Sequence, residues 1–190
     1  VYCGEEGLHC GVDPDLNCDL EQLARFLSKY RPYYLTLYGG EPCLRPKLIA
    51  ALLDQLDPTE VVLHTNGTML RNLQPFALLE KIRTIILSID GGPALTDYYR
   101  GEGTYQLIAD NIKWLLDSGW DHRVFARMTV SEQTQHLDRA VIHLLNVPWC
   151  RFDGVCWQLN ALFKSPGYDW SDFPDWLSTR YEPAIDRLTD

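Results

Sequence analysis

Five short β-prone runs alternate with helical repeats along this chain, and the alternation constrains the fold more than any other feature. Between the runs, apolar residues recur at helical spacing, as in Leu48, Leu52 and Leu56. Strands that alternate with helices indicate βαβ units and a parallel sheet. Because such crossovers are right-handed, the sheet curls into a barrel or forms a doubly wound layer. The expected strands cover residues 33–38, 61–65, 84–89, 124–130 and 155–162.

Caps and breakers indicate where the helices begin and end. Asp19 is expected to cap a first helix that ends at Arg31-Pro32, and Asp57-Pro58 ends the second. Thr104 is expected to cap a later helix, which stops at Gly119. The remaining helices are expected over 73–82, 137–145 and 176–188, the last with a break near Pro183.

The length and composition exclude several classes of protein. A chain of 190 residues with 46% hydrophobic residues suits one globular domain, whereas a closed eight-stranded barrel needs about 250 residues. The net charge of −9 argues against a nucleic-acid partner. The sequence contains neither a run of about 18 apolar residues nor a signal peptide at Val1. We therefore expect a partial barrel in the cytoplasm, with reduced thiols and no membrane partner.

Chemistry in α/β folds sits at the carboxyl ends of the strands. Three of the expected strand ends carry polar turns that contain glycine, which allows close approach of a ligand to the backbone. A carbonyl or carboxylate there could accept from an ammonium group, and an arginine fork could bind a carboxylate. Ordinary turns and a structural ion pair of Arg127 stay open as alternatives. The five ends are Gly39-Gly40-Glu41-Pro42, Thr65-Asn66-Gly67, Ser88-Ile89-Asp90-Gly91, Arg127 with Thr129, and Gln158 to Asn160.

These strand ends resemble the radical S-adenosylmethionine (radical SAM) superfamily in their order and spacing. Gly39-Gly40-Glu41-Pro42 resembles the G-G-E-P motif of the family, whose backbone receives the amino group of SAM. The stretch from Ser88 through Asp97 and Arg100 to Asn111 resembles peptide-modifying members, such as anaerobic sulfatase-maturating enzymes of the SPASM type. The resemblance covers residues 1 to about 163, so 1–163 is the expected core and 164–190 a bridge toward a possible auxiliary-cluster extension.

The resemblance implies which residues contact SAM. Arg127 would bind the SAM carboxylate, while Ser88 and Asp90 would lie near the ribose and carboxylate. Tyr2 would pack near the adenine, which the backbone of the strand containing Leu159 would border. The full set of implied SAM-binding residues is Tyr2, Gly39, Gly40, Glu41, Pro42, Asn66, Ser88, Asp90, Arg127 and Leu159.

Val1-Tyr2-Cys3 resembles the end of the family's C-x-x-x-C-x-aromatic-C motif, which holds a 4Fe–4S cluster. Cys3 is then a cluster ligand, and two further cysteines and the first strand of a partial (β/α)6 TIM-like barrel are expected upstream of Val1. The stretch alone would be catalytically silent. Cys10 and Cys18 could form an unusual site with His9, but free or buried thiols are the simpler interpretation. Cys43, Cys150 and Cys156 are expected to be small buried apolar residues.

The resemblance implies that SAM is cleaved reductively to methionine and a 5′-deoxyadenosyl radical, which abstracts hydrogen from a peptide or protein side chain. An electron donor such as flavodoxin or ferredoxin is implied as a partner, and no catalytic acid or base can be assigned. A truncated or degenerate barrel that binds a peptide or nucleotide without turnover is the main alternative. An aldolase-type barrel would need a phosphate-binding loop or a lysine at a strand end, and no expected strand end carries a lysine.

Overall fold

A computed structural model describes residues 19–56, 60–74, 76–131, 134–159 and 173–189. Within these ranges five parallel strands form one sheet in the order β1-β2-β3-β4-β5, so each strand pairs with the next strand of the chain. A doubly wound sheet would reverse this order at a switch point, whereas sequential order is that of a barrel. The partial-barrel architecture is therefore confirmed. The strands are β1 (Tyr34–Leu37), β2 (Glu60–Thr65), β3 (Ile82–Ser88), β4 (Arg123–Val130) and β5 (Gly154–Leu159).

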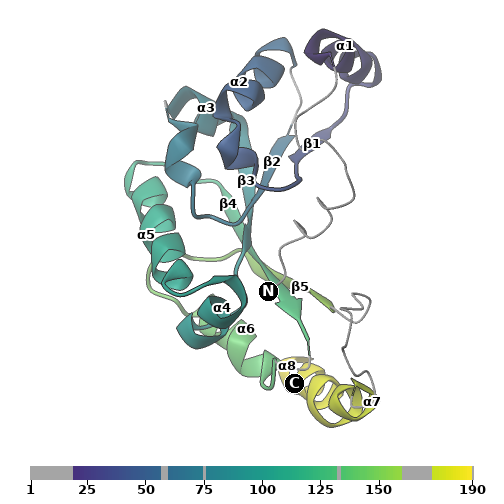
Figure 1. Ribbon diagram of the computed structural model, residues 1–190, viewed down its shortest axis with the longest axis vertical. Coiled ribbons are helices and arrows are strands. Elements are labelled where there is room, and N and C mark those ends of the chain that lie inside the picture. Colours follow the sequence, from purple (N-terminus) through teal and green to yellow (C-terminus); the bar gives the residue numbers. More distant parts are fainter. Residues whose placement is uncertain (1–18, 57–59, 75, 132–133, 160–172, 190) are drawn as a thin grey trace.

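The helices that connect the strands lie on one side of the curved sheet (Figure 1). None of the helices in the described ranges is long and apolar enough to cross a membrane. Their bounds are α1 (Leu20–Tyr30), α2 (Pro46–Gln55), α3 (Phe76–Lys81), α4 (Pro93–Arg100), α5 (Thr104–Asp117), α6 (Leu137–Leu145), α7 (Phe173–Trp176) and α8 (Glu182–Thr189), with a 3₁₀ turn at Pro42–Leu44, another at Leu70–Leu73 and a π-helical turn at Leu177–Tyr181.

Alternate residues of the strands point to opposite faces of the sheet, and the two faces differ in burial. On the helix side, Leu87, Ala126 and Met128 are fully buried. Their neighbours Ser88 and Arg127 point the other way and are only partly buried. We call this second side, turned away from the connecting helices, the inner face. In a barrel it encloses the site, so polar side chains near its carboxyl edge are the candidates for ligand binding.

Several expected elements differ from those observed. Residues Pro93–Arg100, expected as a loop, form helix α4, with Pro93 in its first turn. Thr104 is not a cap: α5 begins at this residue, and the Thr104 hydroxyl donates to the Arg100 carbonyl. The helix expected over 73–82 is shorter at both ends, because Leu73 still belongs to the 3₁₀ turn and Ile82 already belongs to β3. The break expected near Pro183 is observed as the π-helical turn just before α8. Proline has no backbone N–H, so the regular helical hydrogen bond cannot form at Pro183.

The final helices pack against the barrel. Trp176 is buried between Phe173 and Tyr181, with ring centroids 5.7 Å and 5.6 Å apart. Arg187 of α8 donates to Asp138 of α6 at 2.6 Å, and this contact lowers the pKa of the Asp138 carboxyl. This part of the C-terminal segment therefore covers one end of the barrel, with Trp176 in the core and Phe173 and Tyr181 packed against it. The expected boundary at residue 163 lies outside the described residues and stays a prediction.

Candidate functional site

Polar side chains from four strands meet on the inner face near the carboxyl edge of the sheet. Ser88 of β3 and Arg127 of β4 are register partners, and Thr129 pairs with Gln158 of β5 in the same way. Across β3, Arg127 reaches His64 of β2. Strands far apart in the sequence thus bring their ends to one place, as a barrel site requires.

The Glu41 carboxylate ties the first two strand ends together. Its Oε1 accepts from the Thr65 hydroxyl at 2.7 Å and from the Cys43 backbone N–H at 3.0 Å. Its Oε2 accepts from the Asn66 backbone N–H at 2.7 Å. Since both oxygens are engaged by the chain, Glu41 braces the turn after β1 against the turn after β2.

Only a few polar groups at the turns after β1 and β2 are free to bind a ligand. Gly39 and Gly40 are exposed, and a Cβ built on either would have no atom within 4 Å. The Asn66 side-chain oxygen accepts from Thr68, whereas its amide nitrogen has no partner among the described residues. Backbone at Gly39-Gly40 and the Asn66 amide are therefore the groups that a ligand could reach.

Replacing Gly67 with Ala is expected to lower the free energy of unfolding by about 2–3 kcal/mol. Gly67 has φ +77°, and its Cβ would lie 2.5 Å from Cδ1 of the buried Leu87. Gly103 is a matched control, because its φ is +78° and its Cβ would meet nothing within 4 Å. Urea unfolding should show a loss of about 1 kcal/mol for Gly103→Ala, from the backbone alone. Equal losses in the two variants would contradict the clash.

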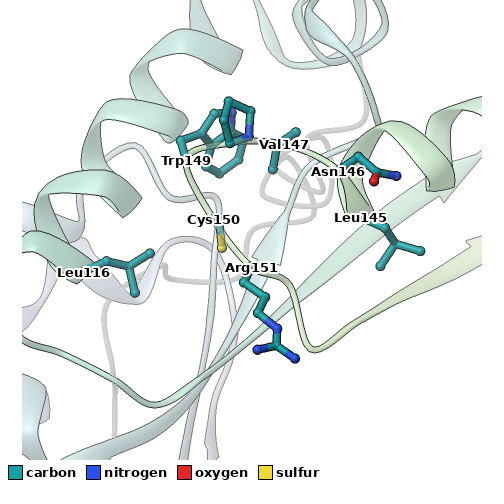
Figure 2. Close-up of a pocket in the computed structure, with 8 residues that line it drawn as sticks. Leu116, Leu145, Asn146, Val147, Trp149, Cys150 and Arg151 are labelled. Carbon is teal, nitrogen blue, oxygen red and sulfur yellow. The ribbon is translucent and has the colours of Figure 1, made fainter.

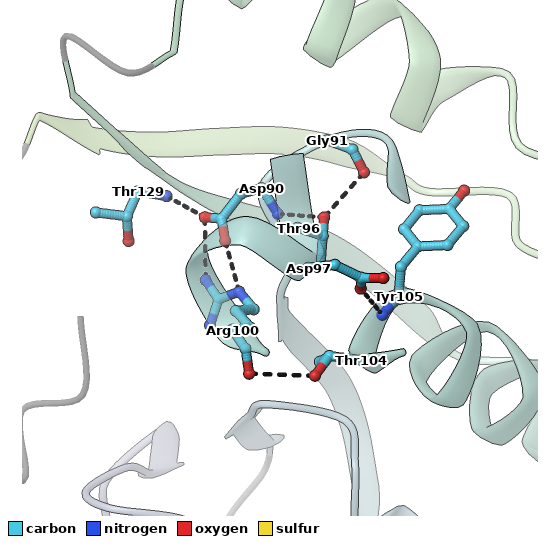
Figure 3. Close-up of polar contacts among 8 residues, drawn as sticks. All are labelled: Asp90, Gly91, Thr96, Asp97, Arg100, Thr104, Tyr105 and Thr129. Carbon is cyan, nitrogen blue, oxygen red and sulfur yellow. Dashed lines mark hydrogen bonds and ion pairs between the residues drawn. The ribbon is translucent and has the colours of Figure 1, made fainter. Parts of the chain in front are cut away.

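Asp90 is fully buried at the end of β3, where its carboxylate is surrounded by donors from the chain (Figure 3). Arg100 of α4 binds it through Nε at 2.6 Å and Nη2 at 3.1 Å. The Thr129 backbone N–H donates to it at 2.8 Å. Asp90 thus links α4 to the ends of β3 and β4, and its expected contact with SAM stays a prediction.

Other members of the same stretch also stabilise turns. The Asp97 carboxylate accepts from the backbone N–H of Tyr105 (Figure 3). It also accepts from the backbone N–H of Gly103, so Asp97 caps α5 from α4. Asn111 of α5 donates to the carbonyls of Gly67 and Thr68. The residues that carry the family resemblance here therefore hold the strand-end turns in shape.

Arg127 has neutral partners only. Its Nη1 donates to His64 Nε2 at 3.0 Å and its Nη2 to Gln158 Oε1 at 2.5 Å. Among the described residues no carboxylate forms an ion pair with Arg127, and Ser88 beside it has no hydrogen-bond partner. The structural ion pair considered for Arg127 is therefore absent from the described part of the chain. A partly buried guanidinium without a counter-charge is suited to bind an anion.

His64 and Gln158 join the site without having been singled out as site residues from the sequence. Burial, with a smaller effect of Arg127, lowers the pKa of His64 to about 4, so the imidazole is neutral near pH 7. The Tyr38 ring lies against it, with centroids 4.7 Å apart. The alternation of side chains along a strand could have indicated His64. Leu63 and Thr65 point to one face of the sheet and are buried, so the polar residue between them points to the other face.

The remaining predicted site residues fall into two groups. Leu159 is the last residue of β5, and its side chain packs toward the helices, which leaves only its backbone toward the inner face. Tyr2 and Cys3 lie outside the described residues, as do Cys10 and Cys18 of the unusual site considered as an alternative. In the ranges that are described, no cluster of three His, Cys, Asp or Glu side chains could hold a metal ion.

The cysteine predictions are partly confirmed. Cys43 and Cys150 are buried free thiols, and burial raises the pKa of Cys150 to about 12 and that of Cys43 still further. Cys156 is exposed, so its expected burial is wrong. The reason is its place on β5, where it alternates with the core-facing Val155 and Trp157 and therefore points to the inner face.

A groove of about 350 Å³ lies away from this site, between α5 and the loop that precedes β5 (Figure 2). Because that loop leads into β5, the groove lies at the amino ends of the strands, where barrels place few reactive groups. We assign it no role in the candidate site. Its lining consists of Leu116, Leu145, Asn146, Val147, Pro148, Trp149, Cys150 and Arg151.

Comparison with protein families identifies the group to which this chain belongs. The radical SAM superfamily profile matches residues 2–140. The chain belongs to the radical SAM superfamily. Membership implies SAM and an iron–sulfur cluster, the cofactors of an enzyme of this superfamily. No functionally curated protein has a significant match to the chain.

Solved structures with the same fold include native anSMEcpe, an anaerobic sulfatase-maturase, with bound AdoMet (SAM) and a Kp18Cys peptide. The TM-score is 0.69 at 16% identity, over 88% of this chain and 50% of that one. Native anSMEcpe with bound AdoMet and a Cp18Cys peptide gives 0.68 at 18% identity, with the same coverage. The chain spans about half the length of these structures, and at such identities the likeness shows the fold.

Proposed function

We propose that this chain is the core of a radical SAM enzyme that cleaves SAM reductively and abstracts hydrogen from a peptide or protein side chain. SAM would bind on the inner face, at the carboxyl ends of the strands. The observation that carries the proposal is Arg127, a guanidinium without an acidic partner among the described residues, beside the open hydroxyl of Ser88.

The donors and acceptors at this edge suit the two ends of a SAM molecule. Arg127 and Ser88 would hold the carboxylate by charge and hydrogen bonding. Backbone carbonyls at Gly39-Gly40 would accept from the amino group, because both glycines are exposed and a Cβ on either would meet no atom within 4 Å. Glu41, Pro42 and Asp90 would keep these groups in place, and the Asn66 amide would be a further donor.

The adenine would lie toward β5, along the backbone of Leu159 and near Tyr2. A 4Fe–4S cluster held by Cys3 and two cysteines upstream would supply the electron that cleaves SAM. The inner face of the barrel would orient the substrate and exclude water. A flavodoxin or ferredoxin is the proposed donor of the electron, in a reducing compartment such as the cytoplasm.

The choice of a peptide or protein substrate rests on two observations about relatives. The 88–111 stretch resembles peptide-modifying members, and the anSMEcpe structure with this fold carries a bound peptide. Because those structures are about twice as long as this chain, the peptide contacts of the parent protein are not assigned to residues here.

The test uses the protein expressed from its complete gene and reconstituted anaerobically with iron and sulfide. We expect broad iron–sulfur absorption in the near-ultraviolet and visible range. With a reductant, SAM should be converted to methionine and 5′-deoxyadenosine. A protein that binds SAM or a peptide but shows neither the absorption nor the cleavage would be a binding module, and the enzyme proposal would fail.

A further inference from the structure

Arg127 is held from two sides by side chains that carry no charge. β4 lies between β3 and β5, yet the guanidinium extends over β3 to reach His64 on β2 and also contacts Gln158 on β5. An arginine has five N–H donors in a planar fork, and these contacts engage Nη1 and Nη2 only. The Nε–H therefore stays open among the described residues, together with a second hydrogen on each Nη.

The hydrogen bond between His64 and Arg127 has one possible direction. A guanidinium can only donate, so an imidazole nitrogen must accept, and a protonated imidazole has no acceptor left. The groups that face His64 are Arg127 and Arg100, which disfavour its protonated form, and Glu41, which favours it. Burial is the largest influence on its pKa and keeps the ring neutral near pH 7.

We infer that His64 is a positioning residue that aims the Arg127 guanidinium at a ligand carboxylate while leaving its positive charge uncompensated. The inference rests on the proposed function, because it takes the carboxylate to be that of SAM. An acidic residue at position 64 would instead pair with Arg127 and neutralise it. An apolar residue at position 64 would leave the long Arg127 side chain free to adopt other rotamers. The guanidinium would then no longer be preorganised for the carboxylate, and binding would weaken.

Tyr38 makes a well-matched substitution possible. Its ring packs on His64 at 4.7 Å between centroids, so a phenylalanine at position 64 keeps an aromatic partner for Tyr38 and removes only the acceptor. His64→Gln keeps an acceptor without the ring. His64→Glu keeps an acceptor and adds the opposing charge.

The experiment measures equilibrium binding of SAM, and of 5′-methylthioadenosine as a ligand without a carboxylate, to the cluster-loaded protein. We expect His64→Phe to weaken SAM roughly tenfold, about 1.4 kcal/mol, and His64→Gln to stay within about twofold. His64→Glu should weaken SAM at least as much as His64→Phe. Binding of 5′-methylthioadenosine should not change in any of the three variants.

A double-variant comparison separates this role from simple packing. In an Arg127→Gln background, the further change His64→Phe should leave SAM affinity unchanged, because the group that it aims is gone. An equal loss in both backgrounds would overturn the inference, and so would unchanged SAM binding in His64→Phe. If Arg127→Gln alone leaves SAM binding unchanged, the proposed site itself is wrong. His64→Leu serves the same comparison if His64→Phe does not fold.

Discussion

Replacing Asp90 with Ala is expected to lower the free energy of unfolding by about 3–5 kcal/mol, measured by urea unfolding without ligand. Asp90 is fully buried and accepts hydrogen bonds from both Nε and Nη2 of Arg100. The Arg100 side chain is itself only 22% exposed. The alanine would leave this guanidinium without its counter-charge and the Thr129 N–H without an acceptor. The loss should appear whether or not the cluster is present.

Asp117→Ala is the matched control for this prediction. Asp117 also forms an ion pair, with Lys113 at 2.7 Å, but both side chains are more than 60% exposed. Its removal should change stability by less than about 0.5 kcal/mol. In addition, Arg100→Met combined with Asp90→Ala should cost less than the sum of the two single changes, since each alone leaves a charge unpaired. Additive losses would show that the pair is not coupled.

The strand and helix order could be predicted because buried strands and amphipathic helices show in the apolar residues themselves. All five expected strands occur, and α6 has the expected bounds of Leu137–Leu145. Helix α4 could not be read in this way, because its buried residues are Thr96 and Tyr99, which do not form an apolar stripe in eight residues. Pro93 after Gly92 was the available signal for its start.

The roles of Glu41 and Asp90 show why part of the site could not be predicted. An acidic residue in a glycine-rich turn is equally suited to contact a ligand and to brace the turn. The sequence places Thr65 24 residues from Glu41 and Arg100 10 residues from Asp90, so only the fold shows that these partners engage the carboxylates. The sequence allowed the prediction that Arg127 binds a carboxylate. It gave no indication of the neutral partners of Arg127, because His64 lies 63 residues away.

Replacing Glu41 with Ala is expected to lower the free energy of unfolding by about 3 kcal/mol in the absence of any ligand. Three donors would lose a charged acceptor: the Thr65 hydroxyl and the backbone N–H groups of Cys43 and Asn66. Glu41→Gln should cost about half as much, because its oxygen can replace one carboxylate oxygen while its NH₂ group faces a donor. Glu21→Ala, with a side chain that is 78% exposed, should be nearly neutral and serves as the control.

The sign of the Glu41 effect distinguishes a bracing residue from one kept only for ligand contact. Side chains that serve only a ligand are commonly neutral or stabilising to replace in the ligand-free protein, because their polar groups lack partners in the chain. Glu41 has three such partners, so its replacement should destabilise the ligand-free protein. Thr65→Val should be strongly non-additive with Glu41→Ala, since both changes break the same 2.7 Å hydrogen bond. Unchanged or increased stability in Glu41→Ala would instead assign the carboxylate to SAM.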